Sequence, residues 1–162
     1  MNNINSEGIY IKDKYFIGEC LKINLYTENN NNIYNANSTI NINYLQNIHL
    51  VAKDEIIIKR DINLIEFPLF KIDSGLLTLG EENMKGKITI DGNKDNVSAT
   101  AHLIQMIEGE LSIYDNVIIC NNLLKISKLS ENLFDYGSTA LIQLNSKINN
   151  MEETFQIIFK KY

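Results

Sequence analysis

The chain has 162 residues, a formal net charge of −5 and 44% hydrophobic residues. Its length fits one domain or a piece of a longer repeat protein, and the apolar content excludes global disorder. The negative charge argues against nucleic-acid binding, for which a basic face is expected, and against binding to anionic membrane surfaces. No apolar run approaches the roughly 20 residues that a membrane span requires.

Ile and Asn dominate the composition, while the chain contains one Pro and no Trp. The branched Cβ of Ile favours strands, and Asn accepts the left-handed conformation of tight turns. The composition therefore predicts many short strands joined by tight turns. Ile and Asn also have A/T-rich codons, so a low-GC bacterial genome would favour the same residues.

Cys20 and Cys120 lie far apart, and neither belongs to a CxxC motif or a Cys/His cluster. We therefore expect two buried free thiols rather than a zinc site or a disulfide. The start of the chain lacks the basic region and apolar stretch of a signal peptide. The expected location is the cytoplasm if Met1 is the native start. It is the cell surface or the exterior if the chain is a fragment of a longer protein.

Residues 1–45 differ from the rest of the chain and are expected to form an N-terminal β cap. Residues 8–17 suggest a hairpin, and apolar residues alternate with polar ones over 21–25 and again over 38–44. The polar run 28–32 predicts a loop. A segment of this kind would cover the open end of a stack of β-coils, where unpaired backbone would otherwise be exposed.

From residue 46 onward the chain shows internal repeats, which indicate coils of a solenoid. Residues 69–79 align with 103–113 without a gap, so that Gly75 matches Gly109, and 141–146 resembles the opening of the same unit. Glycine is expected at these bends because a Cβ would clash there. The alignment places Asp73 beside Ile107, Ser74 beside Glu108 and Asp91 near Cys120. It places no two carboxylates at equivalent positions.

A second marker recurs independently of the glycines. Three strands run into turns that end at Asn93, Asn122 and Asn150, about 29 residues apart. Each Asn suits a left-handed turn, and stacked Asn side chains can form hydrogen-bonded ladders. Residues 48–59 form an earlier, degenerate unit of the same kind.

These repeats predict an all-β, right-handed parallel β-helix over residues 46–162. Stacking at about 4.8 Å buries the apolar faces of the units and pairs their backbones with the coils above and below. The alternative architecture is a β-sandwich or jelly roll. One short helix is expected over 130–136, with Ser130 as its N-cap, and residues 154–162 are expected to form a final strand.

The stretch 47–150 resembles the pectin-lyase-like right-handed parallel β-helix proteins of bacterial cell surfaces, of the adhesin-like type. The resemblance is carried by LFKIDSGLLTLG (69–80), KITIDGN (87–93) and LIQMIEGELSIYDNVIICNN (103–122). That family includes adhesin-like surface modules, polysaccharide lyases and hydrolases, and phage tail spikes. The resemblance therefore implies the fold but does not determine the activity.

Carboxylates are the first candidates for chemistry, because β-helix enzymes cut polysaccharides with grouped acidic residues. The sequence offers six such residues, namely Asp73, Asp91, Asp95, Glu108, Glu110 and Asp115. The motifs that the resemblance would bring from polygalacturonases are absent: closely spaced Asp pairs, a His flanked by Gly, and Arg-x-Lys. The sequence also lacks GxSxG, P-loop, GxGxxG and HExxH motifs.

Cofactor binding has one candidate site, a calcium loop at Asp91, Asn93 and Asp95. These residues alternate as in a short calcium loop, but His102 stands where an EF-hand would place its Glu. We expect the three to be solvated turn residues, and we expect no cofactor and no metal. His49 and His102 are isolated in the sequence, which is typical of surface or core histidines rather than catalysts.

We therefore expect a non-enzymatic β-helix module that binds a polysaccharide or a surface protein along its flat flank. The alternatives are a polysaccharide lyase or glycoside hydrolase of β-helix fold, and a trimeric phage tail-spike fragment. Tyrosines concentrate in the N-terminal third, where they suggest either a glycan-binding face or ordinary strand residues. They are Tyr10, Tyr15, Tyr26, Tyr34 and Tyr44.

Overall fold

The computed structural model describes residues 3–4, 20–25, 32–43, 46–124, 142–144 and 155–160. Within these residues the chain is almost entirely β, and every strand pairing is parallel. The strands are β1 (Asn3–Ile4), β2 (Cys20–Leu25), β3 (Ile33–Ala36), β4 (Ile40–Ile42), β5 (Asn47–Ala52), β6 (Glu55–Arg60), β7 (Phe70–Leu79), β8 (Lys87–Asp91), β9 (Ile104–Tyr114), β10 (Val117–Cys120), β11 (Ile142–Leu144) and β12 (Phe155–Lys160), with a short 3-10 helix, η1 (Ile62–Leu64), between β6 and β7.

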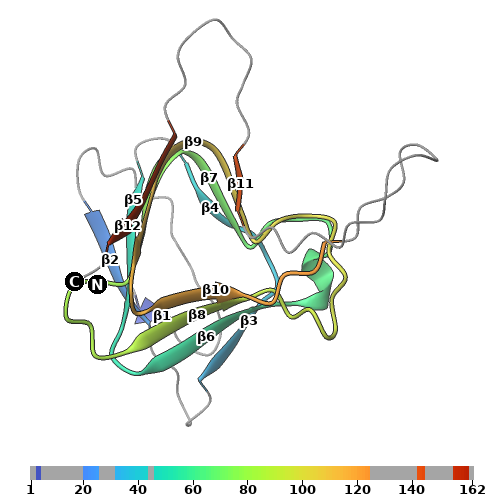
Figure 1. Ribbon diagram of the computed structural model, residues 1–162, viewed down its shortest axis with the longest axis horizontal. Coiled ribbons are helices and arrows are strands. Elements are labelled where there is room, and N and C mark those ends of the chain that lie inside the picture. The colour runs from blue at the N-terminus through green and yellow to red at the C-terminus, as the bar shows by residue number, and fades with distance from the viewer. Residues whose placement is uncertain are drawn as a thin grey trace, which may run out of the picture.

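The strands stack into a β-solenoid of about three turns, as the repeats predicted. Figure 1 looks down the stack and shows a triangular outline with β2, β5 and β12 on one side, β4 and β11 on the second, and β3, β6, β8 and β10 on the third. Strands β7 and β9 bend around the apex and so belong to the first two sides. The third side is a separate four-stranded sheet in the order β10-β8-β6-β3.

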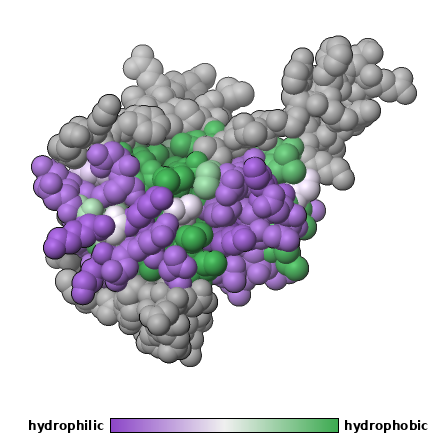
Figure 2. All heavy atoms as spheres, turned by 60° about the horizontal axis from the view of Figure 1, so that its bottom comes forward, coloured by the Kyte–Doolittle hydropathy of each residue, from purple (hydrophilic) through white to green (hydrophobic). Residues whose placement is uncertain are grey.

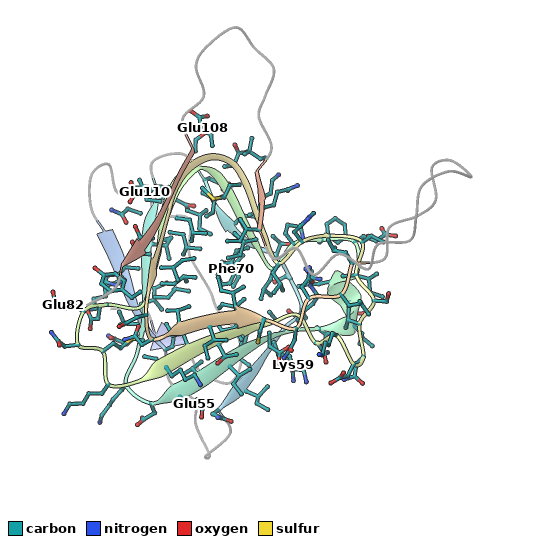
Figure 3. The ribbon with its side chains drawn as sticks, viewed as in Figure 1. Glu55, Lys59, Phe70, Glu82, Glu108 and Glu110 are labelled. Atoms are coloured by element: carbon teal, nitrogen blue, oxygen red, sulfur yellow. The ribbon has the colours of Figure 1, made fainter. Side chains whose placement is uncertain are left out.

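Alternation along each strand fills the interior of the triangle. In β6 and β8 the residues Ile56, Ile58, Ile88 and Ile90 are buried, while the residues between them are at least partly exposed. Phe70 points into the interior and is fully buried (Figure 3). Burying side chains of this size contributes roughly 1.5–3 kcal/mol each. The apolar core therefore depends on every coil keeping the same in-and-out phase.

The pairing register confirms most of the repeat alignment. Phe70 pairs with Ile104 and Leu79 with Ile113, so both ends of the two aligned segments match. Strand β11 pairs with the start of β9, and Asp91 pairs with Cys120. The predicted final strand is also present, as β12 on β9.

The register at the apex differs from the predicted one. Two irregularities occur there, so that Asp73 pairs with Glu108 and Gly75 pairs with Gly109. Strand β9 carries an extra residue at Ile107, and β7 carries its own extra residue one step later. The expectation that Asp73 lies beside Ile107, with no two carboxylates at equivalent positions, is therefore wrong.

The extra residue of β7 is Ser74, which adopts a left-handed conformation with φ +65°. Its hydroxyl donates a hydrogen bond of 2.7 Å to Glu108 Oε2, so the predicted proximity of Ser74 and Glu108 is confirmed.

Gly75 and Gly109 are stacked at this bend. Gly109 has φ +108°, and a Cβ there would lie 2.1 Å from the carbonyl oxygen of Gly75. A Cβ on Gly75 would lie 2.7 Å from the carbonyl oxygen of Asn43 in the coil below. The coils can therefore approach to hydrogen-bonding distance at the apex only where side chains are missing.

Strands of the expected N-terminal cap continue the same sheets. β2, β3 and β4 pair in parallel with β5, β6 and β7. In β2 the apolar Ile23 and Leu25 are buried, as their alternation with polar residues predicted. The division of the chain at residues 45 and 46 stays a prediction. The expected hairpin over 8–17, the helix over 130–136 and the turn at Asn150 lie outside the described residues.

Helical structure in the described residues is limited, and none of it has the length and apolar character needed to cross a membrane.

We predict that Gly109→Ala lowers the free energy of unfolding by about 3 kcal/mol or more, because the new methyl group collides with the Gly75 carbonyl. Ser74→Gly, at the neighbouring bulge, is the control. Glycine accepts the left-handed conformation without strain but loses the exposed hydrogen bond of Ser74 to Glu108, so we expect the two effects to offset to within about 1 kcal/mol. Guanidinium denaturation measures both variants, and equal losses in the two would contradict the stacked-glycine account.

Candidate functional site

The candidate site is the outer face of the four-stranded sheet, which is the bottom side in Figure 1. Strand alternation sends one set of side chains into the core and the other set outward. Figure 2 turns this side toward the viewer and shows a largely hydrophilic surface interrupted by hydrophobic patches. We define the outer face by the outward residues Ile33, Asn35, Glu55, Ile57, Lys59, Lys87, Thr89, Asp91, Ile118 and Cys120.

A row of β-branched side chains crosses the middle of the outer face. Ile118 pairs with Thr89, Thr89 with Ile57, and Ile57 with Ile33. We call these four residues the isoleucine row. Its two end residues, Ile118 and Ile33, are 40% and 39% exposed. The row thus presents a ridge of methyl groups with one hydroxyl, that of Thr89, and it runs the full width of the sheet with one residue per strand.

Charged residues flank the isoleucine row on both sides. On one side Glu55 pairs in register with Lys87, and Lys87 Nζ lies 3.9 Å from Glu55 Oε1. On the other side Lys59 pairs in register with Asp91. Glu55 and Lys59 both point outward from β6 (Figure 3). The sign therefore alternates along each strand and also between the two strands, and we call this pattern the charge checkerboard.

Asp91 is held in place by hydrogen bonds from the turn that follows β8 and from the turn that follows β10. Its Oδ1 accepts from the backbone nitrogen of Asn93 at 2.7 Å, and its Oδ2 accepts from Asn121 Nδ2 at 3.2 Å. The left-handed residues here are Asn93, with φ +58°, and Asn121, with φ +57°. In the second turn the left-handed residue thus precedes the predicted Asn122, whose side chain is buried.

The candidate calcium ligands take part in the same turn. Asn93 Nδ2 donates to the carbonyl oxygen of Arg60, and Asn93 Oδ1 accepts from Asn96 Nδ2. Asp95 is exposed. Within the described parts of the chain, no group of three or more His, Cys, Asp or Glu residues could hold a metal ion. The hydrogen bonds of Asp91 and Asn93 therefore shape the turn.

Arg60 is the most unusual residue behind this face, and it belongs to no motif or repeat of the sequence. It is the single arginine of the chain and is fully buried. Its Nη1 donates to Asn122 Oδ1 at 2.9 Å and its Nη2 to the carbonyl oxygen of His102 at 2.7 Å. Burial lowers the pKa of Arg60 to about 10, so it remains a cation at neutral pH. It joins the end of β6 to two later coils.

Arg60 is also incompletely satisfied. Its Nε has no hydrogen-bond partner in the described residues. The two oxygens that it binds are a neutral amide oxygen and a backbone carbonyl oxygen. A buried cation needs strong hydrogen bonds to offset its lost hydration. The loops that supply these two oxygens are therefore tied to the position of Arg60.

The other candidate carboxylates lie away from the outer face. Glu108 and Glu110 lie around the apex and the first side of the triangle (Figure 3), where Glu110 Oε1 accepts a hydrogen bond from Ser112 Oγ at 3.0 Å. Asp73 pairs with Glu108 at the bend, and Asp115 is exposed in the turn before β10. Among the six candidate carboxylates, the strand register pairs Asp73 with Glu108 and pairs no other two of them.

The remaining predicted residues have local roles. His49 Nε2 lies 2.7 Å from the carbonyl oxygen of Gly80, and His102 contributes its carbonyl to Arg60. Cys120 is a free thiol as expected, but it is half-buried on the outer face and not fully buried. Burial, with a further effect of Asp91, raises the pKa of its thiol. Of the five tyrosines of the N-terminal third, Tyr34 lies in the described residues and packs against the core.

Comparison with known proteins adds no assignment, since no protein-family model, curated protein or solved structure matches this chain. The parallel solenoid and the surface that it presents are thus the grounds for a functional argument.

We predict that Arg60→Lys lowers the free energy of unfolding by about 2–4 kcal/mol. A lysine keeps the charge but lacks the planar fork that reaches both Asn122 and His102. Lys94→Gln, an exposed change in the neighbouring loop, is the control and should stay within about 0.5 kcal/mol. Chemical denaturation at neutral pH compares the two, and a loss for Arg60→Lys as small as the control's would show that the fork is dispensable.

We predict that millimolar calcium leaves the melting temperature unchanged, because Asp91 and Asn93 already use their oxygens within the turn. Thermal unfolding with added calcium and with chelator measures this. A calcium-dependent rise that is lost in Asp91→Asn would revive the loop as a metal site.

Proposed function

We propose that the chain is a non-enzymatic module of a bacterial surface or secreted β-helix protein, and that it binds a partner through the outer face. The observation that carries this proposal is the isoleucine row framed by the charge checkerboard. Apolar area at the centre of a contact supplies affinity, and charges around it supply orientation and specificity. Core formation does not require this arrangement, because all ten residues point away from the interior.

A protein partner fits the outer face better than a glycan does. Glycan sites commonly stack sugar rings on aromatic side chains, and none of the ten residues that define the outer face is aromatic. Ile33 and Ile118 offer aliphatic area instead, and they are partly exposed in the isolated chain. A pleated row of β-branched side chains suits the similarly ridged surface of another protein.

One observation favours a second candidate function, a polysaccharide lyase or glycoside hydrolase. Asp73 and Glu108 share a register position at the apex, and glycosidases work with paired carboxylates. The hydrogen bond that Glu108 accepts from Ser74 gives Glu108 a structural role in the bend. The outer face therefore remains the stronger basis for a proposal.

We predict that the purified chain releases no unsaturated or reducing ends from a panel of acidic polysaccharides, with or without calcium. The double variant Asp73→Asn, Glu108→Gln is the matched control. Products from the unmodified chain that disappear in this variant would replace the binding role with catalysis at the apex. Products that persist in the variant would also refute the non-enzymatic role and place the active site elsewhere.

A further inference from the structure

We infer that the partner of the outer face is a second copy of this chain, packed face to face across a two-fold axis. This inference rests on the proposed binding role of that face. Its basis is a property of the charge checkerboard: the pattern is complementary to itself. Two-fold symmetry is the commonest arrangement of protein dimers, and it requires a surface that matches its own copy.

The first possible axis runs along the solenoid, above the isoleucine row. Rotation about it exchanges the two flanks of the row while each strand keeps its level in the stack. Glu55 then faces Lys59 of the second copy, and Lys87 faces Asp91 of the second copy. Each pair joins opposite charges, and symmetry produces each of them twice.

The second possible axis runs parallel to the strands, between β6 and β8. Rotation about it exchanges these two strands while each flank of the isoleucine row stays on its own side. Glu55 then faces Lys87 of the second copy, and Lys59 faces Asp91 of the second copy. All four contacts again join opposite charges, because the sign alternates in both directions across the sheet.

The isoleucine row maps onto itself under either axis. Two sheets that pack face to face lie about 10 Å apart, with their ridges in contact. The row would then bury the aliphatic area that the isolated chain leaves open at Ile33 and Ile118, which are about 40% exposed. The same contact therefore satisfies the apolar and the charged parts of the face.

The outer face has no net charge, and this favours a second copy of the chain over a strongly charged partner. Two carboxylates and two ammonium groups cancel, so the checkerboard attracts neither a strongly acidic nor a strongly basic partner by net charge. The positions of its charges disfavour any partner surface whose charges are arranged differently. A second copy supplies the required arrangement by symmetry.

Sedimentation velocity over a concentration series tests the inference. We expect the unmodified chain to form dimers as its concentration rises. Ile118→Lys should weaken dimerisation by about tenfold or more, because it places a charge in the apolar row. Leu76→Lys is the matched control, because Leu76 is 39% exposed but lies on β7, on another side of the triangle. Its dimerisation should be unchanged.

Charge reversals test the symmetry itself. Glu55→Lys alone should weaken dimerisation under either axis. Adding Lys59→Glu should restore it if the axis runs along the solenoid, and adding Lys87→Glu should restore it if the axis runs along the strands. Circular dichroism of each variant checks that it is folded. Restoration in one double variant supports a self-complementary face and identifies the axis.

Three results would overturn the inference. The first is an unmodified chain that stays monomeric at every concentration. The second is equal weakening by Ile118→Lys and Leu76→Lys. The third is failure of both double variants to restore what Glu55→Lys removes. If the chain is a monomer and releases no polysaccharide products, the partner of the outer face is a different protein. If it releases products, the binding role is refuted whatever the oligomeric state.

Discussion

Hydrogen bonding between successive coils is the constraint on which the rest of this structure depends. Each strand completes its backbone pairing with residues roughly thirty positions away, as in the pairing of Ile58 with Ile90. That pairing also fixes which side chains point inward, because a slip of one residue exchanges the two faces of a strand. A slip in β8 would turn Lys87, Thr89 and Asp91 toward the core. The hydrophobic core and the outer face are thus two results of one register.

Keeping this register requires special residues at the corners of the triangle. At the apex, compensating extra residues in β7 and β9 and the stacked pair Gly75 and Gly109 let the backbones turn together. At the corner after β6, buried Arg60 holds the amide of Asn122 and the carbonyl of His102. One corner removes side chains so that the coils can approach, and the other uses a long polar side chain to join them.

The sequence predicted the solenoid because its markers are tied to the corners. The matching glycines at 75 and 109 correctly predicted that β7 pairs with β9. The strand that ends at Asp91 correctly predicted that β8 pairs with β10. The two bulges at the apex were not predicted, because each strand has one extra residue and the register is the same before and after them. An alignment without gaps therefore does not reveal them. Adjacent Asn residues at 121 and 122 could not be told apart, although one takes the left-handed turn and the other is buried.

The outer face was harder to predict than the fold. Its checkerboard requires the register of β6 against β8, and residues 48–59 repeat the later units only weakly. The signal was present in the reversed charges of Glu55-Ile-Ile-Ile-Lys59 and Lys87-Ile-Thr-Ile-Asp91. It becomes readable once the two segments are known to be parallel partners. Arg60 belongs to no repeat, so no pattern in one sequence could show that its side chain is buried.

The most direct test of this account is a set of methyl–methyl nuclear Overhauser effects across the isoleucine row. Parallel pairing in the stated register predicts cross-peaks from the Thr89 methyl to Ile57 and to Ile118, and from Ile57 to Ile33. Cross-peaks from Thr89 to the buried Ile56 or Ile58 methyls in place of these would contradict the register. They would remove the basis for both the core and the outer face.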